Sequence, residues 1–244
     1  MHNNGRRNLL TLATGAFLVL LCGCEPGDFG SSRVYFEPIR YRLTAEVQTP
    51  EGVRTGSSVI ETTWDRGLSG ATVKGEAVAV DLPNGQTLFV LLRTASNPDW
   101  AGGVPGVDPP DDLKLSINAN EREAEAGRQV AWMRANRDVH YLWGGSVPKE
   151  RAQYLPYMVR FAQLSNPSSA ERVEPEDLSA SFGPGYSLTS LSVTITGEPV
   201  THNIERRLTW LSRFPEPRLE KIPTGGVAAP TFAQSISHGD FLRN

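Results

Sequence analysis

Few residues in this chain combine the types and spacing that catalysis needs. A hydrolytic triad requires a histidine that can take a proton from a nucleophile, and beyond the N-terminal segment the candidates are His140, His202 and His238. His140 is the best placed of these, and Ser57 and Ser58 could serve as its nucleophile. No G-x-S-x-G elbow is present to hold a serine, and packing within an aromatic cluster explains His140 equally well.

Ser146 and Lys149 have the S-x-x-K spacing with which penicillin-interacting serine enzymes place a lysine beside the nucleophile. Such a serine would attack a lactam or peptide carbonyl. Pro148 between the two residues opposes the helix that would bring them to one face, and no K-T-G or S-D-N motif follows. We therefore predict no catalytic set, and a periplasmic serine hydrolase is the alternative hypothesis.

Metal and phosphate sites are not predicted either. The histidines have no metal-ligand spacing, and Asp108–Asp112 lacks the alternating oxygen ligands and the turn glycine of an EF-hand loop. Gly183–Gly185 lacks the lysine of a phosphate-binding loop, and we interpret it as a helix stop. We expect no metal and no cofactor.

The residues that precede Cys24 indicate a specific chemistry for this cysteine. Arg6 and Arg7 precede an apolar stretch over 9–21, and Gly23 stands just before the cysteine, an arrangement typical of an export signal. The stretch is shorter than the roughly 20 residues of a membrane-spanning helix. The run Leu21–Cys24 resembles the lipobox of bacterial lipoproteins, in which the cysteine is acylated and becomes the N-terminus after cleavage.

This resemblance implies a location for the protein. Residues 1–23 would be the signal peptide and 24–33 a flexible tether, with the lipid on Cys24 holding the protein in the membrane. Glu25 stands where aspartate would favour retention in the inner membrane. The resemblance thus favours the inner leaflet of the outer membrane, facing the periplasm, and leaves Sec and twin-arginine export open.

The net charge and the positions of the cysteines limit which partners the protein can bind and what can stabilise its fold. The formal net charge is −3, and removal of Arg6 and Arg7 with the signal makes it more negative, which argues against a nucleic-acid partner. Both cysteines lie at the signal junction, so a disulfide cannot stabilise the exported domain. Its hydrophobic core must do so alone.

Alternation of apolar and polar residues predicts two N-terminal hairpins. The first has a turn at 49–52, and the second turns at Asn84-Gly85, a strong hairpin signal. The strands that we expect span 34–47, 53–64, 73–82 and 86–93. Two meandering hairpins predict a sheet that is mainly antiparallel.

The second half mixes helices with strands, which predicts an α+β fold. We expect one domain over 34–214 and a poorly ordered tail over 215–244 because prolines and Gly225-Gly226 recur there. A division inside the 95–112 loop is the alternative. The expected elements are strands 113–117, 157–164 and 188–196, a helix over 118–136, a helical turn from 174 stopped at 182–185, and a helix from Thr201 with the stripe Ile204, Leu208 and Leu211.

Two further features have alternative interpretations. Gly56 interrupts the second expected strand, which indicates a β-bulge or a close approach of another backbone. We interpret a group of aromatic residues as part of the core, with a binding surface as the alternative. These residues are Trp132, Tyr141, Trp143, Tyr154 and Tyr157.

The segments Tyr41–Glu61, Gly75–Pro83 and Phe161–Trp210 resemble a group of uncharacterised proteobacterial proteins. That resemblance implies a shared fold and adds no site residue. Our leading hypothesis is a non-enzymatic envelope lipoprotein that binds an envelope protein or a small ligand. The alternatives are a serine hydrolase built on Ser146, or on Ser57 or Ser58 with His140, and a structural spacer.

Overall fold

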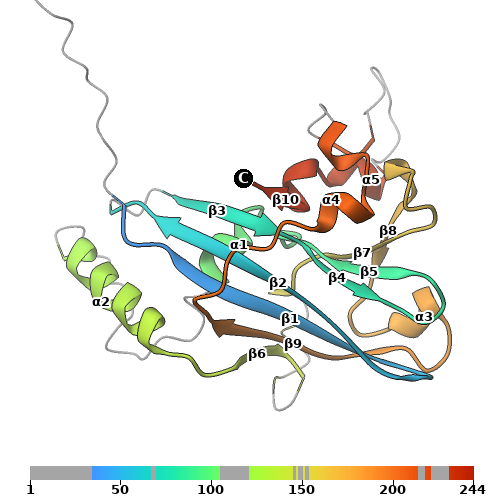
Figure 1. The fold of residues 1–244 in the computed structure, drawn as a ribbon, viewed down its shortest axis with the longest axis horizontal. Helices are drawn as coiled ribbons and strands as arrows, with labels where there is room; N and C mark the ends of the chain where they lie inside the picture. The colour runs from blue at the N-terminus through green and yellow to red at the C-terminus, as the bar shows by residue number, and fades with distance from the viewer. Residues whose placement is uncertain are drawn as a thin grey trace, which may run out of the picture. The chain divides into compact units, whose positions relative to one another are not determined.

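Two sheets organise the chain, and every pairing between the described strands is antiparallel (Figure 1). The structure is a computed structural model that describes residues 35–66, 70–104, 121–144, 147, 151, 154–213, 218–220 and 231–244. The expected signal, tether and strand 113–117 lie outside these residues. The described helices come mostly in the second half, which confirms the predicted α+β class.

The larger sheet has six strands in the order β10-β3-β2-β1-β9-β6. These strands are β1 (Ile39–Thr49), β2 (Gly52–Trp64), β3 (Ala71–Glu76), β6 (His140–Trp143), β9 (Ser187–Ile195) and β10 (Leu242–Arg243). The smaller sheet has the order β4-β5-β7-β8. Its strands are β4 (Val78–Asp81), β5 (Thr87–Val90), β7 (Met158–Phe161) and β8 (Ala170–Val173).

The first predicted hairpin is confirmed by β1 and β2. Their register runs without a break from the pair Ile39 and Thr62 to the pair Thr49 and Gly52. Every second residue of β1 is buried, as expected for a strand with one face on the core. Gly52 takes a positive φ of 109° at the turn, a conformation that other residues rarely adopt.

The strand predicted over 73–82 is divided in the structure. Its first part is β3, which pairs with β2, and its second part is β4, which pairs with β5 in the smaller sheet. Gly75 has a φ of 134° just before the break, and the Ala77 N–H donates to the Phe241 carbonyl at 2.8 Å. Alternation continues across such a break, so the pattern alone could not reveal that the chain changes sheets.

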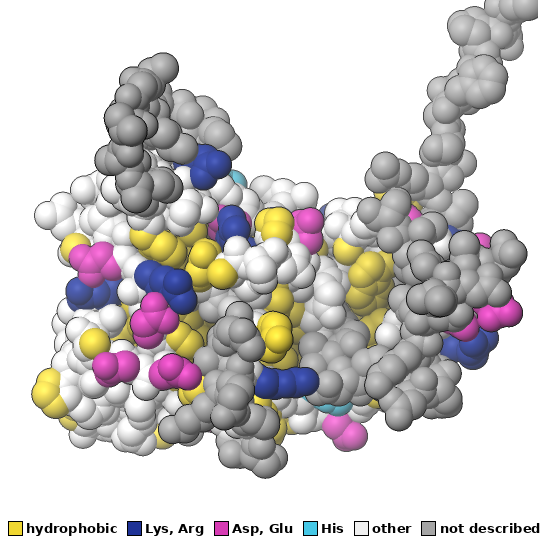
Figure 2. All heavy atoms as spheres, turned by 180° about the vertical axis from the view of Figure 1, so that it is seen from behind, with side chains coloured by type: hydrophobic (Ala, Val, Ile, Leu, Met, Phe, Trp, Pro, Cys, Tyr) yellow, Lys and Arg dark blue, Asp and Glu magenta, His cyan; other side chains and the backbone are white. Residues whose placement is uncertain are grey.

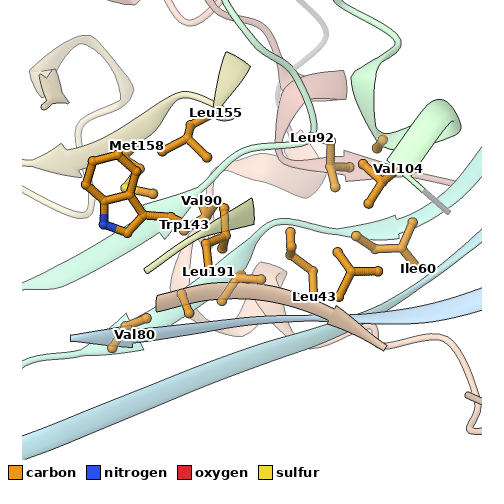
Figure 3. Close-up of a cluster of buried hydrophobic side chains, with 14 of the residues drawn as sticks. Leu43, Ile60, Val80, Val90, Leu92, Val104, Trp143, Leu155, Met158 and Leu191 are labelled. Carbon is orange, nitrogen blue, oxygen red and sulfur yellow. The ribbon is translucent and has the colours of Figure 1, made fainter. Parts of the chain in front are cut away.

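One core lies between the two sheets and a second lies on the outer face of the smaller sheet. In the first, Leu43, Leu191 and Val90 point into the space between the sheets (Figure 3). All four residues of β5 are buried, because this strand has a core on each face. The second core joins Phe89 and Val159 to apolar residues of the C-terminal part of the chain.

Gly56 marks a close approach of the two sheets. A Cβ atom at this position would lie 2.2 Å from the Ala79 carbonyl oxygen in β4. The register of β1 with β2 is continuous through Gly56. Of the two interpretations of this glycine, the close approach of another backbone is therefore confirmed.

The described helices are α1 (Trp100–Gly103), α2 (Arg122–Ala135), α3 (Leu178–Phe182), α4 (Ile204–Arg207) and α5 (Phe232–Ser235). α3 begins where Asp177 accepts a hydrogen bond from the Ala180 N–H, and it stops at Gly183, as predicted. The helix expected from Thr201 is shorter than predicted. Its stripe is buried as expected, but Ile204 lies in α4, Leu208 is the C-cap of that helix, and Leu211 begins a 3₁₀ turn, η5 (Leu211–Arg213).

The prediction of a poorly ordered tail over 215–244 is wrong for residues 231–244. α5, the 3₁₀ turn η6 (His238–Asp240) and β10 follow one another there, and Ile236 and Phe241 are fully buried in the second core. Leu242 and Arg243 extend the larger sheet beside β3. The prolines and glycines that suggested disorder all precede residue 231, and the apolar residues after them cover the smaller sheet. The chain from Arg33 to Asn244 forms one compact unit.

Charged side chains of both signs are interspersed on the face of the molecule that Figure 2 shows. The described ion pairs include Arg160 with Glu171 and Arg172 with Glu174. Exposed pairs of this kind contribute little to stability.

Candidate functional site

The short helix α1 forms one wall of the candidate site, and buried hydroxyl groups hold it in place. A helix leaves its last carbonyl groups without partners. Here the Tyr41 hydroxyl of β1 donates to the Ala101 carbonyl at 2.7 Å, and the Thr62 hydroxyl of β2 donates to the Gly102 carbonyl at 3.2 Å. Burial raises the pKa of Tyr41, so this phenol stays protonated and remains a donor.

Helix α2 forms the opposite wall and touches the core through few residues. Ala126, Val130 and Met133 are its buried residues, spaced at helical intervals along one face. Outside that face, Arg66 forms an ion pair with Glu123 and lies over the ring of Phe36 at 5.6 Å. The helix therefore rests on a narrow apolar stripe and on exposed polar contacts.

A cavity of about 400 Å³ lies between α1, α2 and the part of the larger sheet where β2 ends and β3 begins. Its volume is typical of sites for small molecules. Most of the lining is apolar or carries only a small side chain, and the lining residues are Trp64, Gly70, Ala71, Asp99, Gly102, Gly103, Ala126, Gln129, Val130 and Met133.

Small residues keep this cavity open. A Cβ atom on Gly102 would lie 2.9 Å from the Ala71 Cβ atom, so α1 sits almost directly on β3. A Cβ atom on Gly103 would meet nothing within 4 Å. The two adjacent glycines thus have different roles: Gly102 allows close packing, and Gly103 leaves space in the cavity.

The electrostatics of the cavity favour an uncharged ligand. Among the described residues that line it, Asp99 is the only acidic one, and this carboxylate accepts a hydrogen bond from Arg243 at 3.1 Å. Trp64 and Gln129 supply N–H groups that have no partner within the described part of the chain. The described residues include no group of three or more His, Cys, Asp or Glu side chains that could hold a metal ion. An apolar ligand with one hydrogen-bond acceptor would match this lining.

The structure does not bring the candidate triad residues together. Ser58 in β2 and His140 in β6 are separated by the two strands β1 and β9. In the register of the sheet, Ser58 lies opposite Leu43 of β1, Leu43 opposite Val193 of β9, and Val193 opposite His140. Because neighbouring strands lie about 4.8 Å apart, Ser58 and His140 are separated by about 14 Å. Ser57 faces the opposite side of the sheet and accepts a hydrogen bond from Arg42 at 2.9 Å.

The three histidines lie in different parts of the structure. His140 lies beside Asn136, with 3.1 Å between their side-chain nitrogens, and its ring packs edge-on to Trp132. This contact supports the interpretation of His140 as a member of an aromatic cluster. His202 is exposed at the residue before the α4 N-cap, and His238 begins η6. Cys24, Ser146, Lys149 and Asp108–Asp112 lie outside the described residues.

The aromatic group named from the sequence divides between the core and the surface. Trp143 is buried and donates to the Leu188 carbonyl at 3.2 Å, and Trp132 packs against the first core. Tyr157 packs against the second core. Tyr141 and Tyr154 are more than half exposed. Core packing is therefore confirmed for three of the five residues.

Sequence reasoning missed the cavity. The buried stripe of α2 and the Gly102-Gly103 pair were the available signals, but neither identifies a site until α1 and α2 are placed together beside the end of β2 and the start of β3. The chain matches no protein-family model, no curated protein and no solved structure. None of the described helices is long and apolar enough to cross a bilayer.

Proposed function

We propose that this protein is a non-enzymatic binding module of the cell envelope, anchored by lipid on Cys24 and facing the periplasm. The observation that carries the binding role is the 400 Å³ cavity beneath α2, with its mainly apolar lining. The export segment and the lipobox-like run before Cys24 support the location.

The ligand that fits this cavity is a small, uncharged and mostly apolar molecule. A ligand that buries about 200 Å² of apolar surface gains about 5 kcal/mol from leaving water. Loss of translational and rotational freedom offsets about 4 kcal/mol or more of that gain. Contacts to Trp64 or Gln129 must therefore contribute to any tight binding.

The binding role can be tested with N-phenyl-1-naphthylamine, an uncharged apolar probe that fluoresces strongly in apolar surroundings. We expect the protein to enhance its fluorescence and Gly103→Leu to abolish this enhancement, because leucine would fill the open space beside Gly103. Gly239→Leu is the matched control: only the Ser237 Oγ atom lies near the Gly239 Cβ position, at 4.0 Å, and Gly239 lies outside this cavity. Equal enhancement by both variants would refute the binding site.

The anchor has a separate test. Cys24→Ala should release the protein from membranes and block labelling with alkyne-palmitate, since no acyl chain can then be attached. Retention of unlabelled protein in the membrane pellet would contradict the lipoprotein assignment. Because this outcome does not depend on the cavity, the two parts of the proposal can fail separately.

A further inference from the structure

A second cavity lies beside the C-terminal end of α2, where β1 begins and β9 ends. Its volume is about 340 Å³. Three arginines and two glutamates contribute to the lining, together with apolar and small residues; the lining residues are Glu37, Pro38, Ile39, Arg40, Glu61, Arg134, Arg137, Ile195, Thr196 and Gly197. The charged side chains of this cavity therefore carry a net charge of +1.

The three arginines differ in how strongly their guanidinium groups are held by partners within the protein. Arg40 Nε donates to Glu61 at 2.8 Å, and the Glu61 side chain is only 12% exposed, so this pair is well held. Arg134 pairs with Glu37, whose side chain is 73% exposed. A pair this exposed contributes little free energy and can be displaced.

Arg137 has the weakest described contact of the three. Its one described contact is a long hydrogen bond of 3.5 Å from Nη1 to the Ile195 carbonyl oxygen. A guanidinium group offers several N–H donors in a planar fork that matches the two oxygens of a carboxylate. Arg137 therefore retains donors for a ligand at the edge of the cavity.

We propose that this cavity binds a small organic monocarboxylate, with Arg137 and Arg134 holding the carboxylate and Glu37 competing for Arg134. A single negative charge neutralises the net charge of the lining, whereas a phosphate dianion would leave an excess of negative charge beside Glu37 and Glu61. The apolar part of the ligand would contact Pro38 and the neighbouring isoleucines.

Benzoate and its neutral analogue benzamide test this proposal. Their binding to the folded protein can be followed by NMR chemical-shift titration at low ionic strength, where charge interactions are least screened. We expect benzoate to shift the signals of Arg134, Arg137 and Gly197, and benzamide to leave them unchanged. Equal shifts from the two compounds, or no shift from benzoate, would overturn the proposal.

Variants separate a specific site from general attraction of an anion to the surface. Arg137→Gln should weaken benzoate binding about tenfold, because a hydrogen bond between charged groups is lost. Arg128→Gln removes the same charge from an exposed position on α2 outside the cavity and should leave the affinity unchanged. If both variants weaken binding equally, the arginine cavity is not the site.

Glu37→Gln tests the competition directly. Removal of the competing carboxylate should tighten benzoate binding about two- to fivefold, the range expected for an exposed ion pair. Gly197→Leu fills the cavity without a change of charge, because the Gly197 Cβ position is open, and should abolish binding. Unchanged affinity in both variants would refute the assignment even if Arg137→Gln weakens binding.

Discussion

The region beneath α2 and the region around the smaller sheet are packed in opposite ways. α2 rests on Ala126, Val130 and Met133 and borders two cavities of about 340 and 400 Å³. Around the smaller sheet, aromatic rings meet edge to face: the Phe89 and Phe161 rings are 5.6 Å apart, and Phe161 and Trp210 are 5.8 Å apart.

We call α2 with its two cavities the open region. The closed region is the smaller sheet, the C-terminal cover (residues 231–244) that packs on it, and the contact between Gly56 and Ala79. Protein interiors are normally as dense as organic crystals, and the closed region has the filled core expected of such packing. The open region contributes less to stability because its helix has few buried contacts. What it offers instead is space for a ligand.

The largest expected effect comes from Phe241, which is fully buried and contacts three other aromatic rings in the closed region. Phe241→Ala should lower the free energy of unfolding by about 3–5 kcal/mol, as is typical when a buried phenylalanine is truncated. Urea denaturation measures this change. A loss below about 1 kcal/mol would mean that the C-terminal cover is not an integral part of the fold.

Gly56 tests the closest contact in the closed region. Gly56→Ala should destabilise the protein by about 3 kcal/mol, the upper part of the range for overpacking, because the new methyl group would meet the backbone of Ala79. Thermal unfolding can compare it with Gly103→Ala, where the Cβ position is open. Similar melting temperatures for the two variants would show that the sheets can move apart without loss.

Met133 gives the corresponding test of the open region. Met133→Ala should cost about 2 kcal/mol, the lower limit for such truncations, because this side chain borders the cavity. The variant should lose less stability than Phe241→Ala in the same urea experiment. If Met133→Ala is the more destabilising of the two, the contrast between the regions is wrong.

Asp240 gives the smallest effect and tests the closed region by pH. Burial raises the pKa of this carboxyl above its usual value near 3.8, against opposing hydrogen bonds from Ser237 and the charges of Arg93 and Arg243. A raised pKa means that protonated Asp240 favours the folded state, and this contribution is lost as pH rises through the folded-state pKa.

Asp240→Asn has no proton to lose. Its stability relative to the natural protein should therefore increase as pH rises from 3 to 7, in urea titrations at fixed ionic strength. A difference that stays constant with pH, or changes in the opposite direction, would contradict the raised pKa. His238→Asn, in the same turn, controls for the titration of the neighbouring histidine.

The sequence could predict elements whose signals are local. Alternation identified β1, β2 and β9, and Asn84-Gly85 identified the hairpin of β4 and β5. The stop of α3 at Gly183 was predicted because a helix stop depends on a few adjacent residues, whereas the turn expected from 174 begins four residues later, after the N-cap Asp177. Gly56 was recognised as a close approach or a bulge, but its partner in β4 could not be named.

Features that depend on distant contacts were not predictable. The chain changes sheets at Ala77, where a hydrogen bond from the Ala77 N–H to the carbonyl of Phe241 fixes the path. Phe241 and Ile236 follow a stretch rich in proline and glycine that suggests a poorly ordered tail. Only the outer face of the smaller sheet shows where these two side chains are buried. The cavity beneath α2 depends in the same way on α1 and α2 meeting where β2 ends and β3 begins.

The pairing of β10 with β3 has a consequence for the order in which the protein is made. A chain that leaves the ribosome or a translocation channel N-terminus first exposes β3 and the smaller sheet long before Phe241 and Leu242 follow. Folding can be completed only after residues 241–243 have emerged. A product that stops before Phe241 should therefore be degraded by proteases as an incomplete chain, because β3 then lacks its partner strand.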